Sequence, residues 1–342
     1  MTGEPFCRST ILFLIKSRRL PARLARAAIL LVVMLAVGEG AARLLGKHPW
    51  WPRRLNITVA PGGRFYQKDP VLGYRHLPGV FRVTLPGGYV FTATHDNQTL
   101  RVTHPAGPGK ADIHQKPEIW VFGCSFTHGW SLNDDETFCW KLQTLMPGHE
   151  IVNGGVGGYG NVHALLQLPE TLARRSAPVA VVVTYASFHD ERNTFLRRRR
   201  RHVAPFDALG LAGHPAAVLD ADGGLAITMA DVLYRPVPFS RTLAVANMLE
   251  EWICTVQAAA VDSHAVSEKV IASIDVLAKS ARVPLLVAVI DDDPVSQSML
   301  DFAREQGIRA VSIAVDLNAP GMRNSPNDDH PSPAANTRYA RI

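Results

Sequence analysis

Ser125 stands where an apolar run of the sequence ends and a turn begins. Residues 119–122 are four large apolar side chains, and Gly123 lies between them and the serine. Such a run before a glycine is typical of a buried strand in a parallel sheet, and residues 136–146 favour a helix after the turn. A turn of this kind places one side chain at the carboxyl end of the sheet, where open α/β folds hold their ligands. Ser125 is therefore a candidate nucleophile.

A serine hydroxyl is a weak nucleophile until a base removes its proton and a third group orients that base. Near the other end of the chain, Asp328 and Asp329 come just before His330 in a loop bounded by prolines. The order along the chain is then serine, acid, histidine. This pattern predicts that Ser125, Asp328 and His330 act together in acyl transfer, with Asp329 as the alternative carboxylate.

Cys124 is a rival nucleophile beside Ser125. Neighbouring side chains at the end of a strand point to opposite sides, so we expect Cys124 to be a buried thiol behind the turn. The chain has three further cysteines, Cys7, Cys139 and Cys254, and none forms a CxxC pair. The cysteine pattern therefore indicates neither a zinc knuckle nor a redox motif.

With these residues the chain resembles the SGNH (GDSL-type) hydrolase family from residue 116 to the end. Residues 123–127, Gly-Cys-Ser-Phe-Thr, look like its nucleophile block, in the variant with cysteine in place of the usual aspartate. Residues 153–160 are similar to its second block. The fourth block is normally D-x-x-H, and here Asp328 and His330 fit a D-x-H variant. The resemblance implies a three-layer α/β/α sandwich of the SGNH/flavodoxin-like type and serine hydrolase activity.

The same resemblance implies an oxyanion hole. Its donors would be the amide of Ser125, the amide of Gly158 and a side chain from the third block. That block normally carries an asparagine, whereas residues 186–190 read Ala-Ser-Phe-His-Asp, so His189 takes the asparagine's position. An imidazole N–H could donate to the same oxygen.

The remaining elements must bring these residues together. Helices are expected at residues 162–175, 267–281 and 297–306. The predicted strands are residues 119–122, 150–153, 178–185, 284–290 and 309–315. Five parallel strands with crossover helices predict a three-layer α/β sandwich.

Residues 197–238 interrupt this alternation and predict an inserted flap. They contain a hairpin signal at 216–227 around Asp-Gly-Gly. Five consecutive arginines, 197–201, could hold phosphate head groups or an anionic glycan, or form a solvated helix end. Residues 291–293 are three aspartates, but adjacent side chains diverge, so we expect no metal and no cofactor.

Residues 24–45 form an apolar span preceded by several lysines and arginines. A helix of this length measures about 33 Å, enough for a hydrocarbon core of about 30 Å. Glu39 weakens the prediction because a carboxylate in the bilayer is costly. The preferred interpretation is a cytoplasmic segment at 1–23, a transmembrane signal anchor at 24–45 and an extracytoplasmic remainder, periplasmic or on the cell surface. The alternatives are a signal peptide cleaved near 36–42, giving a secreted protein, and a buried helix of a soluble protein.

Residues 46–115 predict a small β-rich extension before the hydrolase-like domain at 116–342. Strands are expected at 89–94 and 99–103, with turns between them. No chemistry is evident in this segment. His95 and His104 are expected in surface loops.

The net charge of +6 would ordinarily raise nucleic acid as a partner, but the arginines gather in two places and follow no repeated motif. We expect no nucleic-acid partner. The favoured function is a serine esterase acting on an acylated small molecule, glycan or lipid, such as an O-acetyl group of the cell envelope. The alternatives are an envelope polysaccharide O-acyltransferase with the same three side chains and a non-catalytic, membrane-anchored binding module.

Overall fold

A computed structural model describes residues 9–52, 56–105 and 116–342. The chain divides into two compact units. The N-terminal unit holds residues 1–51 and 235–255, and the main unit holds residues 52–234 and 256–342. Residues 1–8 of the expected cytoplasmic segment and 106–115 of the expected extension lie outside the described residues.

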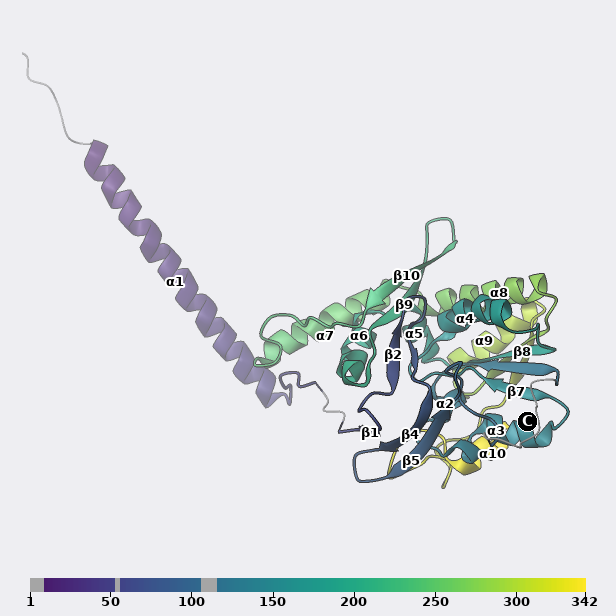
Figure 1. The fold of residues 1–342 in the computed structure, drawn as a ribbon. Helices are drawn as coiled ribbons and strands as arrows, with labels where there is room; N and C mark the ends of the chain where they lie inside the picture. The colour runs from purple at the N-terminus through teal and green to yellow at the C-terminus, as the bar shows by residue number, and fades with distance from the viewer. Residues whose placement is uncertain (1–8, 53–55, 106–115) are drawn as a thin grey trace, which may run out of the picture. The chain divides into compact units, whose positions relative to one another are not determined.

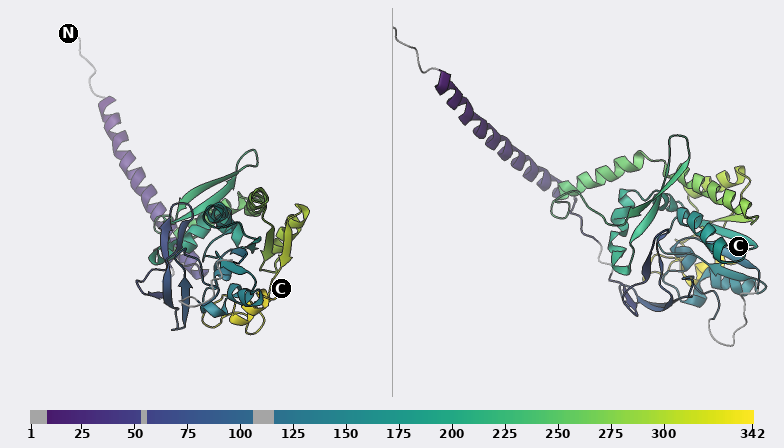
Figure 2. Two further views of the ribbon diagram at one scale, coloured as in Figure 1. Left: turned by 45° about the vertical axis from the view of Figure 1, so that its right-hand side comes forward. Right: turned by 45° about the horizontal axis from the view of Figure 1, so that its top comes forward.

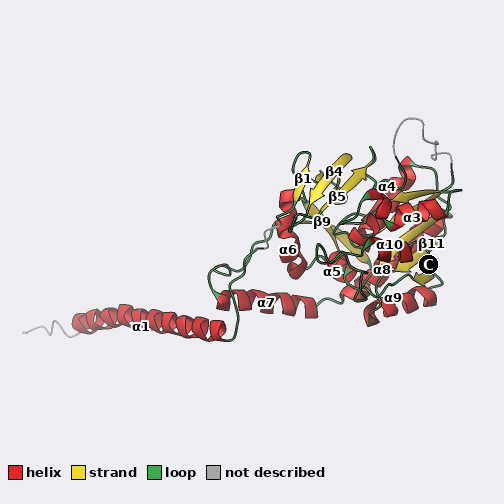
Figure 3. Cartoon of the chain, turned by 90° about the horizontal axis from the view of Figure 1, so that it is seen from below, coloured by secondary structure: helices red, strands yellow, loops and turns green. Residues whose placement is uncertain are grey.

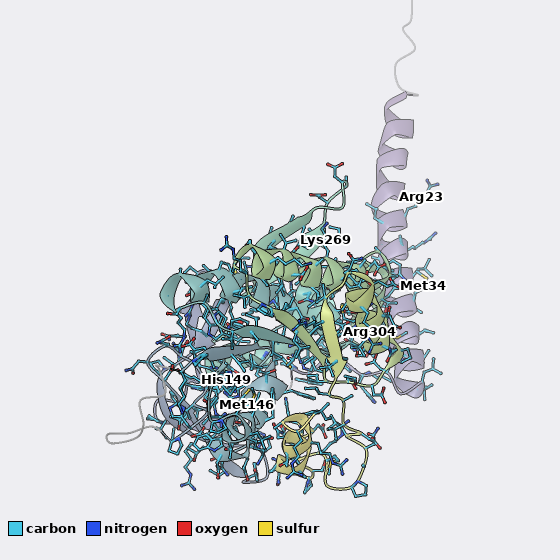
Figure 4. All side chains as sticks on the ribbon, turned by 90° about the vertical axis from the view of Figure 1, so that its right-hand side faces the viewer. Arg23, Met34, Met146, His149, Lys269 and Arg304 are labelled. Atoms are coloured by element: carbon cyan, nitrogen blue, oxygen red, sulfur yellow. The ribbon has the colours of Figure 1, made fainter. Side chains whose placement is uncertain are left out.

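The N-terminal unit is built from two helices, α1 (Ser9–Leu44) and α7 (Ala244–Ala259). Figure 1 shows α1 as one long helix. Its segment Ala22–Leu44 has a mean hydropathy of 1.9 over its most apolar window, so it is long and apolar enough to cross a membrane or to be a signal sequence. The side chain of Met34, for example, projects from the helix in Figure 4 and is 64% exposed.

Glu39 lies near the end of this apolar segment and is bonded within the N-terminal unit. Its carboxylate accepts the backbone N–H groups of Ala244 and Val245, at 3.0 and 3.1 Å, and pairs with Arg43 at 2.6 Å. Ala244 and Val245 open α7, whose first amides have no partner inside the helix. The Glu39 carboxylate, whose charge is unfavourable in a membrane helix, is therefore hydrogen-bonded and ion-paired within the protein.

The main unit contains a five-stranded parallel sheet in the order β12-β11-β8-β6-β7. The strands are β6 (Glu118–Phe122), β7 (Glu150–Asn153), β8 (Ala180–Tyr185), β11 (Leu285–Val289) and β12 (Arg309–Ser312). All five predicted strands are present, and the predicted fold class is confirmed.

Alternate side chains of these strands enter two separate cores. Trp120 and Phe122 pack on the side covered by α4 (Asn161–Arg174), α8 (Ser263–Ser280) and α9 (Pro294–Glu305). Val121 and Ile151 pack on the opposite side, against α3 (Phe138–Leu145) and α10 (Pro333–Tyr339). Figure 1 shows α4 and α8 on one side of the sheet and α3 and α10 on the other. Since both faces are covered, the strands read as continuous apolar runs.

The extension before the sheet has its own core. Strands β1 (Thr58–Ala60), β4 (Gly79–Thr84) and β5 (Val90–His95) form an antiparallel sheet, and they lie together in Figure 3. β2 (Tyr66–Asp69) and β3 (Gly73–His76) form a hairpin. Residues 99–103 do not form the expected strand. Only Arg101 bridges, once to His95 and once to Asn153.

The inserted segment follows the short helix α5 (His189–Thr194) and opens with α6 (Arg197–Val203). A 3-10 turn at Ala204–Leu209 leads into the antiparallel hairpin of β9 (Gly213–Leu219) and β10 (Leu225–Asp231). Its turn projects from the main unit in both views of Figure 2. Residues 235–255 belong to the N-terminal unit, so the part of the insertion in the main unit ends at Tyr234.

Candidate active site

The structure brings the side chains of Ser125, His330 and Asp328 together. Ser125 opens the short helix α2 (Ser125–His128), directly after β6 and Cys124. The Nε2 atom of His330 lies 2.9 Å from Ser125 Oγ, and its Nδ1 atom is hydrogen-bonded to a carboxylate oxygen of Asp328. The same carboxylate oxygen accepts the backbone N–H of His330 at 2.8 Å. A base and an orienting acid therefore stand in line with the hydroxyl.

The loop that carries His330 is fixed at several points. Asn324 donates from its backbone to the His330 carbonyl at 2.9 Å and from its side chain to the Ser131 carbonyl at 2.9 Å. The backbone N–H of Asp328 donates to the Asn324 carbonyl at 3.1 Å. Asp329 is exposed, and its carbonyl accepts from Arg323. Of the two candidate carboxylates, Asp328 is the one that contacts the imidazole.

Asp328 is held in its charged form. Burial alone would raise the pKa of its carboxyl group, but hydrogen bonds from His330 and Trp130, with the charge of His330, lower that pKa below the ordinary value. Trp130 follows α2 and packs in the core of the β extension. A carboxylate that stays ionised can stabilise an imidazolium on His330.

The glycine loop at residues 154–158 lies against Ser125. A methyl group added at Gly157 would lie 4.0 Å from Ser125 Cβ and 2.7 Å from the hydroxyl of Tyr66. Gly158 has a φ of 87°, which favours glycine, and a methyl group there would lie 2.6 Å from the Tyr74 hydroxyl. Glycine at positions 157 and 158 therefore lets the hydroxyls of Tyr66 and Tyr74 lie against this loop.

Tyr74 sets the orientation of that loop. Its hydroxyl donates to the Gly157 carbonyl at 2.8 Å. Because a trans peptide is planar, the N–H of Gly158 must point away from that carbonyl. The amide of Ser125, as the first residue of α2, has no partner four residues earlier within the helix. We therefore keep the backbone N–H groups of Ser125 and Gly158 as the candidate oxyanion donors.

His189 has a different surrounding from the one expected. It is fully buried, and its Nδ1 atom lies 3.1 Å from Asn161 Oδ1. The amide of Asn161 is oriented by the bond from its Nδ2 to the Thr184 carbonyl, at 2.8 Å, so the imidazole Nδ1 must carry the proton. Burial holds the pKa of His189 well below its usual value, and the neutral ring has only one N–H. His189 in this state has no N–H left for an oxyanion.

Cys124 lies behind the turn, as expected for a structural thiol. Its side chain is fully buried in the core beneath the sheet, with Ala186 and Ala288. Ser125, by contrast, contacts the imidazole of His330 directly. The geometry therefore favours Ser125 over its neighbour as the nucleophile.

Three histidines in the main unit lie close enough together to be considered as ligands of a metal ion. Nitrogen atoms of His76, His95 and His128 lie within 4.8 Å of one another. His95 was expected in a surface loop, and this was wrong, because it is buried in β5. The alternation of β5 turns it inward, away from solvent.

The arrangement of the rings does not suit a shared ion. The rings of His76 and His95 are stacked at 4.0 Å with 9° between their planes, so their in-plane lone pairs run parallel and cannot meet at one point. His95 Nε2 lies 3.0 Å from His128 Nε2, a hydrogen-bond distance, and the guanidinium of Arg101 lies 3.4 Å from the same atom of His128. A cation beside the ligands would repel a metal ion. We interpret the cluster as part of the core, in which His95 and His128 are hydrogen-bonded and the ring of His76 stacks on His95 without a hydrogen-bond partner of its own among the described residues.

Sequence reasoning missed Tyr66, Tyr74 and Trp130, which come from or pack with the β extension. Aromatic residues in short strands are typical of core packing, and each of these also belongs to the core of the extension. The hydroxyls of Tyr66 and Tyr74 reach the glycine loop from the hairpin of β2 and β3, whereas Trp130 follows α2 and packs on the extension. No local signal in the sequence marks that contact.

Comparison with known proteins finds similarity only at the level of solved structures. No family model matches the chain, and no curated protein of related sequence was found. The chain is similar to a protein described as lipolytic, of the G-D-S-L family, from Desulfitobacterium hafniense, with 12% identity over 66% of this chain and 97% of that one and a TM-score of 0.37.

Two further structures are similar to the same extent. TesA has 14% identity over 66% of this chain and 94% of its own, with a TM-score of 0.40. AlinE4, an esterase of the SGNH-hydrolase family, has 13% identity over 58% of this chain and 76% of its own, with a TM-score of 0.33. The interpretation of the site below depends on its own geometry.

Proposed function

We propose that the chain is a serine ester hydrolase with Ser125 as its nucleophile. The observation that carries the proposal is the unbroken series of contacts from Ser125 Oγ to His330 and from His330 to Asp328. His330 takes the serine proton, the serine oxygen attacks the ester carbonyl, and Asp328 stabilises the imidazolium that forms. The alcohol leaves with the proton from His330. Water, activated by the same imidazole, then releases the acid.

The negative charge on the tetrahedral intermediate would be held by backbone amides. Ser125 and Gly158 supply two N–H groups beside the nucleophile, and Tyr74 keeps the second in position. Fixed donors of this type commonly contribute a hundredfold or more to the rate, as an order of magnitude. We leave His189 out of this set because its only proton is engaged with Asn161.

Hydrolysis of para-nitrophenyl acetate by the full chain in detergent tests this function. The wild type should release nitrophenolate, and Ser125→Ala should lower kcat by about a thousandfold or more, because the nucleophile is lost. Cys124→Ala should keep most of the activity, and circular dichroism should show that all three proteins are folded. Equal rates for the wild type and Ser125→Ala would contradict the proposal.

We further propose that α1 anchors the protein in a membrane, with the main unit outside the cytoplasm. The apolar segment Ala22–Leu44 follows a basic stretch, and an excess of positive charge before a span favours a cytoplasmic N-terminus. The protein should then stay in the membrane fraction after alkaline carbonate washing and begin with its original N-terminus. A soluble protein whose N-terminus starts after residue 36 would instead identify a cleaved signal peptide.

A further inference from the structure

The five consecutive arginines of α6 do not share one environment. Arg198 is 53% exposed and pairs with Glu191 at 3.5 Å. Arg200 donates from Nε to the Phe195 carbonyl at 3.2 Å. Arg199 is turned inward instead: its Nε atom is buried and has no hydrogen-bond partner. Within the described parts of the chain, no carboxylate forms an ion pair with it. One arginine of the run is therefore placed inside the main unit without a counter-charge.

Arg199 lies on the glycine loop of the candidate active site. Its Nη2 atom is 3.7 Å from the point where a side chain on Gly158 would begin, on the side occupied by the Tyr74 hydroxyl. The preceding residue, Gly157, is the one that lies against Ser125. The guanidinium is thus next to the loop that would bind the oxyanion.

A second arginine comes from α5 to the same region. Arg192 donates to the Tyr159 carbonyl at 3.0 Å, and its guanidinium lies 4.3 Å from the centre of the Phe188 ring. Its Nε atom is also buried without a partner. Phe188 packs on Phe126, which in turn packs on His330. Arg192 and Arg199 therefore reach the site from two helices that follow β8.

The positive charges of Arg192 and Arg199 repel each other, and both side chains are partly buried. Burial, with the nearby charge of Arg192, lowers the pKa of Arg199 to about 9. The group is still protonated at neutral pH, so a positive charge without a carboxylate ion pair among the described residues remains in this partly buried place. Placing such a charge away from water is costly unless an anion pairs with it. Glu191 attracts Arg199 through its charge, but its ion pair is with Arg198.

We propose that Arg199, flanked by Arg192, binds an anionic group of the substrate, so that the ester bears a carboxylate or a phosphate near the bond that is cleaved. The proposal rests on the proposed hydrolysis at Ser125 and names the class of its substrate. A guanidinium is planar and offers parallel N–H groups, which match both carboxylate and phosphate oxygens.

Matched esters test the charge preference. One pair is para-acetoxybenzoate and its neutral methyl ester, with the charge on the alcohol side. The other is the para-nitrophenyl monoester of adipate and its neutral methyl diester, with the charge on the acyl side. In at least one pair, wild-type kcat/KM should favour the charged member by about 10- to 100-fold, the usual range for a hydrogen bond to a charged group.

Variants of neighbouring arginines provide the control. Arg199→Gln should remove the preference and leave kcat/KM for the neutral esters within about threefold of the wild-type value. Arg199→Lys should keep part of the preference because it keeps the charge. Arg198→Gln, on the exposed side of the same helix, should change neither the preference for the charged ester nor kcat/KM for the neutral esters. Equal loss on charged and neutral esters in Arg199→Gln, or no preference in the wild type, would overturn the proposal.

A binding measurement separates this inference from the proposed activity. Inorganic phosphate should raise the melting temperature of the wild type and of Arg198→Gln, but not of Arg199→Gln. A charged-ester preference without this shift would restrict the ligand to carboxylates. An equal shift in Arg199→Gln, or the absence of both effects, would overturn the proposal. If the wild type cleaves none of the four esters, the proposed hydrolysis fails, and the phosphate measurement still decides the role of Arg199.

Discussion

Asp328 decides which nitrogen of His330 carries the proton. Its carboxylate can only accept, so it requires a proton on Nδ1 and leaves the lone pair of Nε2 facing Ser125 Oγ at 2.9 Å. An asparagine could donate to Nδ1 and reverse this tautomer. At the scale of single residues, the proposed mechanism therefore depends on the Asp328 carboxylate as the acceptor of the Nδ1 proton of His330.

The first prediction concerns that acceptor. Asp328→Asn should lower kcat for para-nitrophenyl acetate by about a thousandfold or more, because the imidazole would present a proton to Ser125 instead of a lone pair. Asp329→Asn is the matched control, since Asp329 is exposed and does not contact the ring. Similar losses in both variants would argue against the assigned role of Asp328.

The second prediction concerns Tyr74. Tyr74→Phe removes only the hydroxyl that donates to the Gly157 carbonyl. A net hydrogen bond is worth about 1 kcal/mol, so kcat should fall by about five- to tenfold while KM stays nearly constant, because the Gly158 amide acts on the oxyanion and not on the bound ester. Steady-state kinetics measure the two constants. A change confined to KM would show that Tyr74 contacts the substrate instead.

The residues of the site differ in how far they could be predicted. Ser125 follows a strand, and His330 lies in a loop bounded by prolines. The sequence pattern alone therefore predicted that both lie at one edge of the sheet. Arg199 could not be separated from its four arginine neighbours, because the direction of a side chain on a short helix depends on what packs beneath it. The proton on His189 was likewise set by Asn161, a distant residue in sequence.

At the scale of elements, the β extension supports the helix that begins with Ser125. The ring of Phe65 packs edge-on against His76, His95, His128 and Trp130, with centroid distances of 5.1 to 5.9 Å. His128 ends α2 and Trp130 follows it. The extension therefore packs against the end of α2 and against Trp130, whose side chain hydrogen-bonds Asp328.

The third prediction tests this support. Phe65 is fully buried, so Phe65→Ala should lower the free energy of unfolding by about 3–5 kcal/mol and reduce activity with it. Phe65→Leu keeps more volume and should cost less. Urea denaturation measures both variants. A loss below about 1 kcal/mol for Phe65→Ala would mean that the extension does not pack on α2.

The sequence pattern predicted the sheet better than the extension. Most of the parallel strands are rich in apolar residues, and the pattern predicted the existence of all five. It did not predict their order in the sheet. Residues 99–103 also have a β-forming composition, yet Arg101 is buried and its guanidinium bonds Asp134 at 2.9 Å and the Leu132 carbonyl at 2.9 Å. The tertiary contacts of the buried Arg101 guanidinium therefore prevailed over the β-strand that local propensity favours at residues 99–103.

At the scale of the whole main unit, buried neutral histidines link stability to pH. Burial lowers the pKa of His76 and of His214 to about 3. It also holds the pKa well below the ordinary value at four other sites. These are His95, His128, His163 and His189. When the chain unfolds, each imidazole returns to water and to a pKa of about 6.5.

The fourth prediction follows from the sign of these shifts. Between about pH 6.5 and 3 the unfolded chain binds a proton at His76 and the folded chain does not, so stability falls as the pH falls. Each such histidine contributes about 1.4 kcal/mol per pH unit. His76→Phe should reduce the slope by about that amount, as measured by urea denaturation at a series of pH values. An unchanged slope in His76→Phe would contradict the account.

The most direct test of the central claim is covalent labelling by a fluorophosphonate, followed by mass spectrometry of the modified peptide. The account predicts one label per chain, with fragment ions placing it on Ser125. The label should persist in Cys124→Ala and disappear in Ser125→Ala, because only Ser125 contacts the base. A label on Cys124 or elsewhere, or no label on the folded wild-type protein, would contradict it.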